Sequence, residues 1–198
     1  MAHPPPLLPP SHCCLRLLSA YIDEPNRMGV YLNWIRLDPW FLVRAYLKHF
    51  GHPRSPLSST ALVHRAFFSH AFPVQEVREF ERTMPEYESM SWSFGMMTKF
   101  VSAERVIGNI LPTLKRRRRV LVVAGGEDKI MDGVIMQRLV AWYRAAWESI
   151  RVKGEDEGQE SSEEVVRFEV VEGSGHHVMK DSMWKVGAET VLQWLEGR

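Results

Sequence analysis

Two runs of β-forming residues, the first of them apolar throughout and each followed at once by a glycine turn, constrain the fold of this chain most. The first run covers residues 120–124 and ends in the turn GGEDK at 125–129, which contains Asp128. The second covers residues 165–171 and ends in EGSGHH at 172–177, which contains His176. Continuous apolar runs are typical of parallel strands buried on both faces. Parallel strands end at one edge of the sheet, where ligands bind, so we expect Asp128 and His176 to be neighbours there.

The two turns resemble those of the α/β-hydrolase superfamily. The segment VLVVAGGEDKI resembles the strand and turn that carry the acid of the catalytic triad, and VEGSGHHVMKD resembles the histidine loop. In that family the triad runs serine, acid, histidine along the chain. The resemblance implies that Asp128 is the acid and His176 the base. The acid holds the histidine in one tautomer, and the histidine activates the serine.

The residues themselves leave alternatives open at both turns. Glu127 is the acid if the register shifts by one residue, and Asp128 could instead cap the next helix. His177 could form a pocket wall beside His176. The histidine pair lacks a third ligand at a useful spacing for zinc, so we expect no metal and no cofactor.

The nucleophile is not assigned, because no G-x-S-x-G motif occurs in the sequence. The segment SWSFG at residues 91–95 has a serine in place of the first glycine, and no strand pattern precedes it. We therefore expect Ser93 to lie on a helix away from His176. Cys13 and Cys14 do not follow a strand either. Ordinary serine-esterase turnover is not expected without the missing motif.

Three regions are expected along the chain. Residues 1–12 form an extended, proline-rich N-terminus, residues 13–118 a helical lid-like region, and residues 119–198 the C-terminal α/β-hydrolase-like region. The expected class is α/β, as a partial α/β-hydrolase fold. A helical, lid-like N-terminal half precedes a small parallel sheet with flanking helices.

Prolines at helix starts and apolar spacing predict the helices of these regions. They are expected at residues 40–50 (capped by Asp38), 58–70, 74–83, 86–99, 132–150 and 181–195. The acidic, glycine-containing stretch 153–164 is expected to be an exposed loop. Residues 7–11 resemble the end of the strand that precedes the lid in the hydrolase family.

Composition excludes several classes of partner. The 198 residues carry a formal net charge of +1, so nothing demands nucleic acid. The KRRRR run at 115–119 is interpreted as a solvated loop, with a nuclear-localisation or phosphate patch as the alternative. No stretch approaches the roughly 20 apolar residues of a membrane span, and the N-terminus lacks the features of a signal peptide. Adjacent cysteines do not favour a disulfide, so we expect a cytoplasmic protein.

The expected function is a serine-hydrolase-type activity on an ester, thioester or amide bond of a small apolar metabolite. Aromatic and methionine residues are dense between residues 34 and 97, which suits an apolar wall over a substrate. The alternative is a non-catalytic binding or interaction module. Because the earlier strands of such a fold are absent from the sequence, one side of the strand 120–124 should lack a partner. Such an edge favours self-association.

Overall fold

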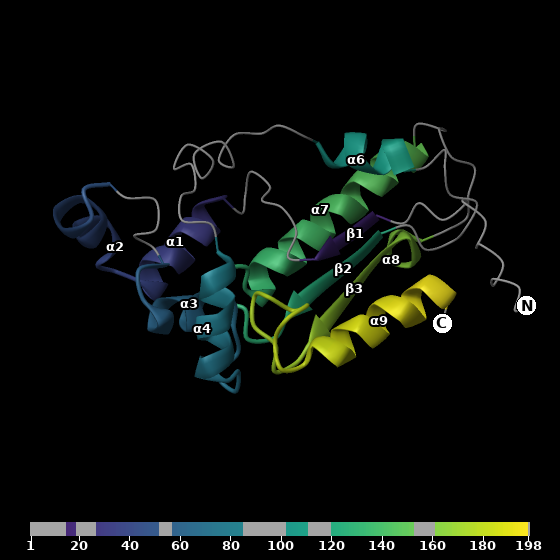
Figure 1. Ribbon diagram of the computed structural model, residues 1–198. Coiled ribbons are helices and arrows are strands. Elements are labelled where there is room, and N and C mark those ends of the chain that lie inside the picture. Colours follow the sequence, from purple (N-terminus) through teal and green to yellow (C-terminus); the bar gives the residue numbers. More distant parts are fainter. Residues whose placement is uncertain are drawn as a thin grey trace, which may run out of the picture.

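A parallel β-sheet lies at the centre of the computed structural model, which describes residues 15–18, 27–51, 57–84, 102–110, 120–152 and 161–197. The strands are β1 (Leu15–Leu18), β2 (Val120–Gly125) and β3 (Val166–Val171), in the order β1-β2-β3. Helices flank the sheet. A helical part, formed by the described segments 27–51 and 57–84, lies beyond the ends to which the strand arrows point (Figure 1). The expected α/β class and its small parallel sheet are confirmed.

The described helices divide between the helical part and the two sides of the sheet. They are α1 (Arg27–Leu37), α2 (Phe41–Val43), the π-helix η1 (Arg44–Lys48), α3 (Thr60–Phe67), α4 (Val74–Thr83), α6 (Ala103–Ile110), α7 (Gly133–Val152), α8 (Ser162–Val165) and α9 (Trp184–Glu196). The helix predicted after Pro73 is confirmed with both of its bounds. The helix predicted at residues 86–99 lies outside the described residues.

Strand β1 departs from the sequence prediction. Leu15–Leu18 falls in the region expected to be helical, yet it pairs in parallel with β2 from Leu15 opposite Val120 to Leu18 opposite Val123. A four-residue leucine-rich stretch does not distinguish strand from helix, so its pairing with β2 decides. The expectation of an unpaired side on residues 120–124 is therefore wrong. The strand end expected at residues 7–11 lies outside the described residues.

The helix expected at residues 40–50 is also different. It consists of α2 and the π-helix η1, and α2 begins after Trp40 without a side-chain cap. Asp38 does not cap it, because its carboxylate pairs with the guanidinium of Arg44, at 2.8 Å from Oδ1 to Nη1. A charged partner one turn further along outcompetes the capping bond. The acidic stretch 153–164, expected to be a loop, contains the start of α8. Ser161 and Glu164 form a capping box at the N-terminus of this helix.

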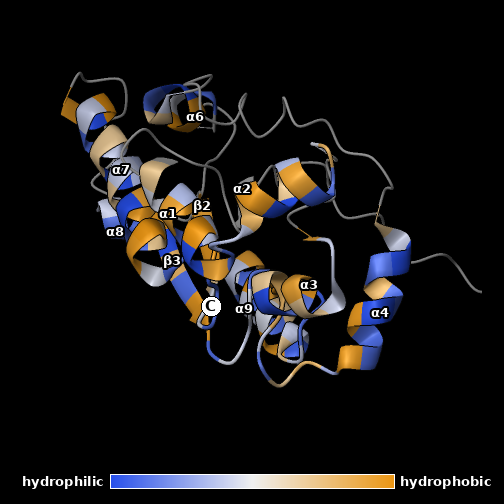
Figure 2. Ribbon diagram, turned by 90° about the vertical axis from the view of Figure 1, so that its left-hand side faces the viewer, coloured by the Kyte–Doolittle hydropathy of each residue, from blue (hydrophilic) through white to orange (hydrophobic). Residues whose placement is uncertain are grey.

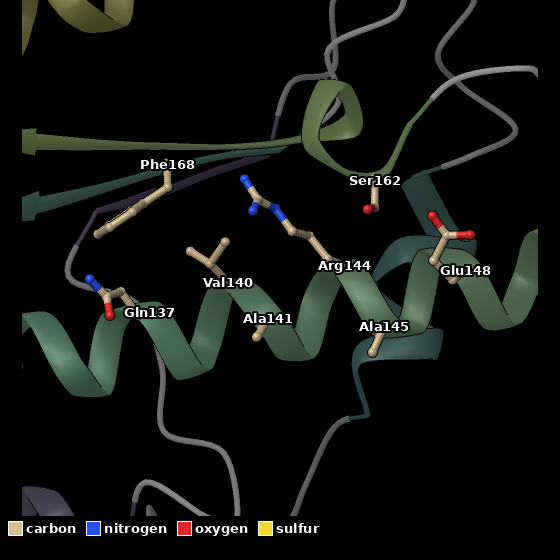
Figure 3. A pocket seen from close by; sticks show the side chains of 8 residues that line it. All are labelled: Gln137, Val140, Ala141, Arg144, Ala145, Glu148, Ser162 and Phe168. Carbon is tan, nitrogen blue, oxygen red and sulfur yellow. The ribbon is translucent and has the colours of Figure 1, made fainter.

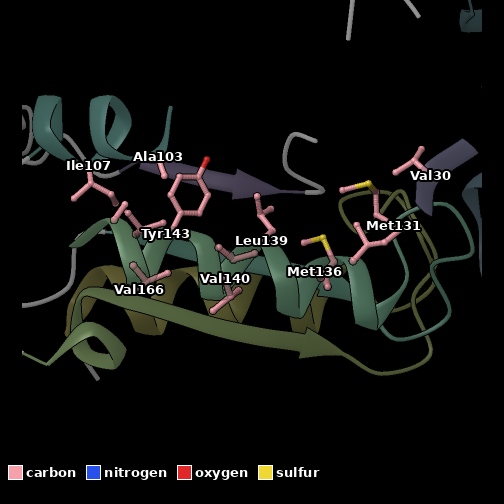
Figure 4. Close-up of a cluster of buried hydrophobic side chains, with 14 of the residues drawn as sticks. Val30, Ala103, Ile107, Met131, Met136, Leu139, Val140, Tyr143 and Val166 are labelled. Atoms are coloured by element: carbon pink, nitrogen blue, oxygen red, sulfur yellow. The ribbon is translucent and has the colours of Figure 1, made fainter. Parts of the chain in front are cut away.

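The core forms on both faces of β2. Val120, Val122 and Ala124 pack with the buried side of α7, while Leu121 and Val123 pack with Trp194 of α9. Figure 4 shows Met136, Leu139, Val140 and Tyr143 of α7 in the first of these clusters. The two-residue repeat of a strand sends alternate side chains to the two helices, which is why every residue of β2 is buried.

Helix α7 has 20 residues and is the longest in the described ranges. Neither it nor any other helix of those ranges combines the length and the apolar character needed to cross a bilayer.

The burial of α7 predicts the effect of leucine truncation. Leu139 is 0% exposed in the core, whereas Leu192 of α9 is 52% exposed. We expect Leu139→Ala to lower the free energy of unfolding by about 2–5 kcal/mol, because it removes buried methyl groups and leaves a cavity. Leu192→Ala should change it by only about 0.5 kcal/mol. Urea unfolding of both variants checks this, and equal losses would contradict the assignment of the core.

Candidate active site

Asp128 and His176 meet at the edge of the sheet where β2 and β3 end. Gly125 of β2 lies opposite Val171 of β3, so the two following turns leave the sheet at the same level. His176 Nδ1 lies 2.8 Å from Asp128 Oδ2, and the Asp128 side chain is 1% exposed against 21% for His176. The expected proximity is confirmed, and a catalytic role for the pair remains a prediction.

The Asp128 carboxylate is fixed by its own turn. Its Oδ1 accepts hydrogen bonds from the backbone N–H groups of Ile130 and Met131, each at 2.8 Å. Asp128 does not cap α7, because that bond comes from Asp132, whose Oδ1 accepts from the Ile135 N–H at 3.0 Å. Oδ2 of Asp128 is thus held toward the His176 ring.

This contact sets the state of the imidazole. A carboxylate only accepts hydrogen bonds, so the proton of neutral His176 lies on Nδ1. The lone pair of Nε2 is then the position that can accept a proton. The ring of Phe67 lies against His176, with 5.8 Å between ring centroids.

Glu127, the alternative acid, has a different partner. Its carboxylate accepts from the backbone N–H of His70 at 3.0 Å and lies 2.8 Å from His70 Nδ1. The backbone N–H of His70, and then its ring, hold the pKa of Glu127 below its usual range. The structure therefore pairs Asp128, and not Glu127, with His176.

His177 belongs to an aromatic wall next to His176. Its ring stacks on Phe68, at 6.0 Å between centroids and an 11° interplanar angle, and meets Phe80 edge-on at 5.1 Å. Phe67 contacts both Phe80 and His177. Burial, followed by the charge of His176, lowers the pKa of His177. His177 is thus part of an aromatic cluster beside the pair, and its role as a pocket wall stays a prediction.

The backbones around the site approach each other too closely for side chains. A Cβ on Gly125 would lie 2.1 Å from the Gly175 carbonyl oxygen, and a Cβ on Gly175 would lie 2.5 Å from the Phe68 carbonyl carbon. The backbone N–H of His177 also donates to the Phe67 carbonyl at 2.8 Å. The acid turn, the histidine loop and the end of α3 are therefore in direct backbone contact.

Several residues that hold this junction were missed from the sequence. Asp181, 0% exposed, joins the histidine loop to Ser69 after α3. Asn33 of α1 donates to the Ile130 carbonyl at 3.1 Å and to Asp132 Oδ2 at 2.9 Å. The sequence pattern predicts that the last helix begins at Asp181, whereas it begins at Trp184. The only local sequence feature that points to Asp181 is its position five residues after His176. No local feature points to Asn33.

A hollow of about 450 Å³ lies elsewhere, between α7, α8 and β3 (Figure 3). Its lining residues are Gln137, Val140, Ala141, Arg144, Ala145, Glu148, Ser162 and Phe168. Arg144 there donates to the Val166 carbonyl, at 3.1 Å from Nη2. None of the lining residues belongs to the acid turn or the histidine loop, so this hollow is separate from the Asp128–His176 pair.

The remaining candidates are only partly covered by the structure. Ser93, Cys13 and Cys14 lie outside the described residues, so the position expected for Ser93 is untested. In the described part of the chain, no three histidine, cysteine or carboxylate side chains come close enough together to hold a metal ion.

Comparisons with protein-family models, with curated proteins and with solved structures found no match for this chain. The geometry of the site alone therefore carries the functional inference.

The close approach at Gly175 predicts a strong effect of one added methyl group. Gly175→Ala should lower the free energy of unfolding by about 1–3 kcal/mol or more, because backbone atoms of Phe68 must move to admit the Cβ. Gly108→Ala in α6 is the matched control, since a Cβ there meets nothing within 4 Å. That variant should be neutral or more stable by up to about 1 kcal/mol. Thermal and urea unfolding measure both, and a harmless Gly175→Ala would contradict the contact.

The half-buried His177 predicts a pH dependence of stability. Its pKa is lowered in the folded chain, so as the pH falls through about 6.5 the unfolded chain binds a proton that the folded chain resists. Stability contributed by neutral His177 is therefore lost on acidification. His177→Phe keeps the ring packing but does not titrate. We expect it to lose less stability than the wild type between about pH 7 and 5.

Urea unfolding at several pH values measures this difference. Phe72→Leu, which alters the same cluster through Phe68 without removing a titrating group, is the control and should keep the wild-type pH dependence. Parallel profiles for His177→Phe and the wild type would show that His177 does not resist protonation.

Proposed function

We propose that Asp128 and His176 are the acid and base of a serine-hydrolase-type site, in a partial α/β-hydrolase fold. The bond cleaved is an ester, thioester or amide of a small apolar compound. The observation that carries the proposal is the 2.8 Å contact between His176 Nδ1 and a buried carboxylate that its own turn fixes. A positioned imidazole with an orienting carboxylate is what acyl transfer requires of its base.

The chemistry follows from the tautomer. Nε2 of His176 removes a proton from an attacking hydroxyl group, and oxygen adds to the carbonyl carbon of the substrate. Asp128 stabilises the imidazolium, which then returns the proton to the leaving alcohol, thiol or amine. The family takes the hydroxyl from a serine in G-x-S-x-G, which this sequence lacks. Within this chain we therefore assign the attack to water.

The substrate class follows from the surroundings of His176. Phe67 packs on the His176 ring, and Phe80 and His177 continue the same aromatic surface. The lowered pKa of His177 keeps that ring neutral near pH 7. These rings favour an apolar acyl or leaving group beside the base.

Hydrolysis of p-nitrophenyl butyrate tests the proposal. We expect slow turnover that His176→Ala reduces by roughly 10²-fold, the lower limit of general-base catalysis. Asp128→Asn should also reduce it, because the amide can stabilise the wrong tautomer. His49→Ala controls for unspecific histidine reactivity and should leave the rate unchanged.

Ser93 is tested in the same assay. Ser93→Ala should keep the His176-dependent rate, and a fluorophosphonate probe should not label Ser93. Labelling that disappears with Ser93→Ala, together with the activity, would instead make Ser93 the nucleophile. A rate that His176→Ala does not change would refute the catalytic proposal.

A non-catalytic binding module is the second candidate, and one observation favours it. Apolar side chains are exposed along α1, α2 and η1, and Figure 2 shows hydrophobic residues on α2. They are Met28, Tyr31, Leu32, Ile35, Leu42, Val43, Tyr46 and Leu47, and the exposed Trp40 and Phe50 lie just outside α2 and η1. Large exposed apolar patches mark interaction sites, so these are the side chains that a partner would cover. Absence of any His176-dependent hydrolysis would favour this candidate.

A further inference from the structure

Asp181 accepts four hydrogen bonds in the interior of the protein. Its Oδ2 accepts from the backbone N–H of Ser69 at 2.6 Å and of Gly175 at 2.8 Å. Its Oδ1 accepts from the Ser69 hydroxyl and the Ser182 N–H, both at 2.6 Å. The residue is 0% exposed. These donors are three backbone groups and one hydroxyl, so this carboxylate meets neutral partners that do not titrate with it.

The four bonds join two distant parts of the chain. Gly175 is the residue before His176, and Ser69 follows the end of α3, more than a hundred positions earlier in the chain than Asp181. One more bond runs beside them, from the His177 N–H to the Phe67 carbonyl. The Asp181 side chain therefore links the histidine loop to the helical part by hydrogen bonds.

The two residues of the pair are positioned in different ways. Asp128 is oriented by backbone N–H groups two and three residues along its own turn. His176 instead follows a loop containing Gly173, which has a φ of 72°, and Gly175. Glycines permit sharp turns but do not favour one conformation. The loop has a backbone bond of its own, from the Ser174 N–H to the Val171 carbonyl, and bonds from other segments add to it in placing the His176 ring.

We propose that Asp181 is a positioning residue for the Asp128–His176 pair. By holding Gly175 against Ser69, it places His176 Nδ1 within hydrogen-bond distance of Asp128. The catalytic meaning of this role rests on the proposed function, while the positioning itself can be measured without any substrate. In this way Ser69 of the helical part influences the position of His176 through Asp181 and the Gly175 backbone.

Asp181→Asn is the sharpest test, because it keeps the size of the side chain. An amide has one accepting oxygen and an NH₂ group that only donates. Two of the four donors then face the NH₂ group. Only the Ser69 hydroxyl can turn to accept from it, so at least one buried backbone N–H is left unpaired, which is costly. We expect the bonds at residue 181 to weaken, the histidine loop to shift and the His176 ring to lose its fixed contact with Asp128.

The readout is the Nδ1 proton of His176 in nuclear magnetic resonance spectra of ¹⁵N-histidine-labelled protein. A proton held between imidazole and carboxylate exchanges slowly and resonates far downfield, and Asp128→Asn identifies it by abolishing it. We expect Asp181→Asn to abolish or broaden this signal while circular dichroism still shows a folded chain. Asp38 is another buried aspartate and pairs with Arg44. Asp38→Asn weakens that pair, so it is the control for general destabilisation and should keep the signal.

Ser69→Ala serves if Asp181→Asn does not fold, because it removes one donor of four and leaves the carboxylate. The Nδ1 proton should then exchange with water several-fold faster than in the wild type. Absence of the proton from the wild type, or an unchanged signal in the folded variant tested, would overturn the positioning role. If the proton behaves as expected but no His176-dependent hydrolysis is found, the proposed function fails and the positioning role stands.

Discussion

The parallel pairing of β2 and β3 is the constraint on which the site depends. The pairing continues past the strands, since the Gly126 N–H donates to the Val171 carbonyl at 2.9 Å and the Glu127 N–H to the Ser174 carbonyl at 2.8 Å. These bonds align the acid turn with the histidine loop residue by residue. The two backbones come so close at Gly125 that no side chain fits. A shift of one residue in register would therefore separate Asp128 from His176 and exchange the side chains that β2 sends to α7 and to α9.

The helical part completes the site from the other side. It reaches the acid turn through Asn33 and through the His70–Glu127 contact, and it reaches the histidine loop through Ser69. Each contact uses a backbone group or a short polar side chain. Such groups are costly to bury unless they are paired, so a small displacement would leave several of them unsatisfied at once. The junction is therefore specific in geometry, beyond the apolar packing that joins the sheet to α7 and α9.

The parts predicted from sequence are those with local signals. Strand β2 is a continuous apolar run, β3 is rich in β-forming residues, α4 has a proline before its first turn, and the turns carry glycines close to Asp128 and His176. The parts missed depend on distant contacts. Strand β1 exists through its pairing with β2, and the Asp38–Arg44 pair replaces a cap that local rules predict. Asp181 has an ordinary position before a helix, and only its bonds to Ser69 and Gly175 reveal its place.

Asp128 and Asp181 are both buried beside the site, but they have different hydrogen-bond partners. This difference indicates different roles for the two carboxylates. Asp128 Oδ1 meets backbone donors, but its Oδ2 meets an imidazole that is partly exposed and can change its charge. Asp181 has only fixed, neutral donors on both oxygens. A carboxylate in contact with an imidazole orients the ring and fixes its tautomer. A carboxylate that accepts only from backbone and hydroxyl donors orients the segments that carry those donors. Asp128 is therefore suited to orienting the base, and Asp181 to holding the loop that carries the base.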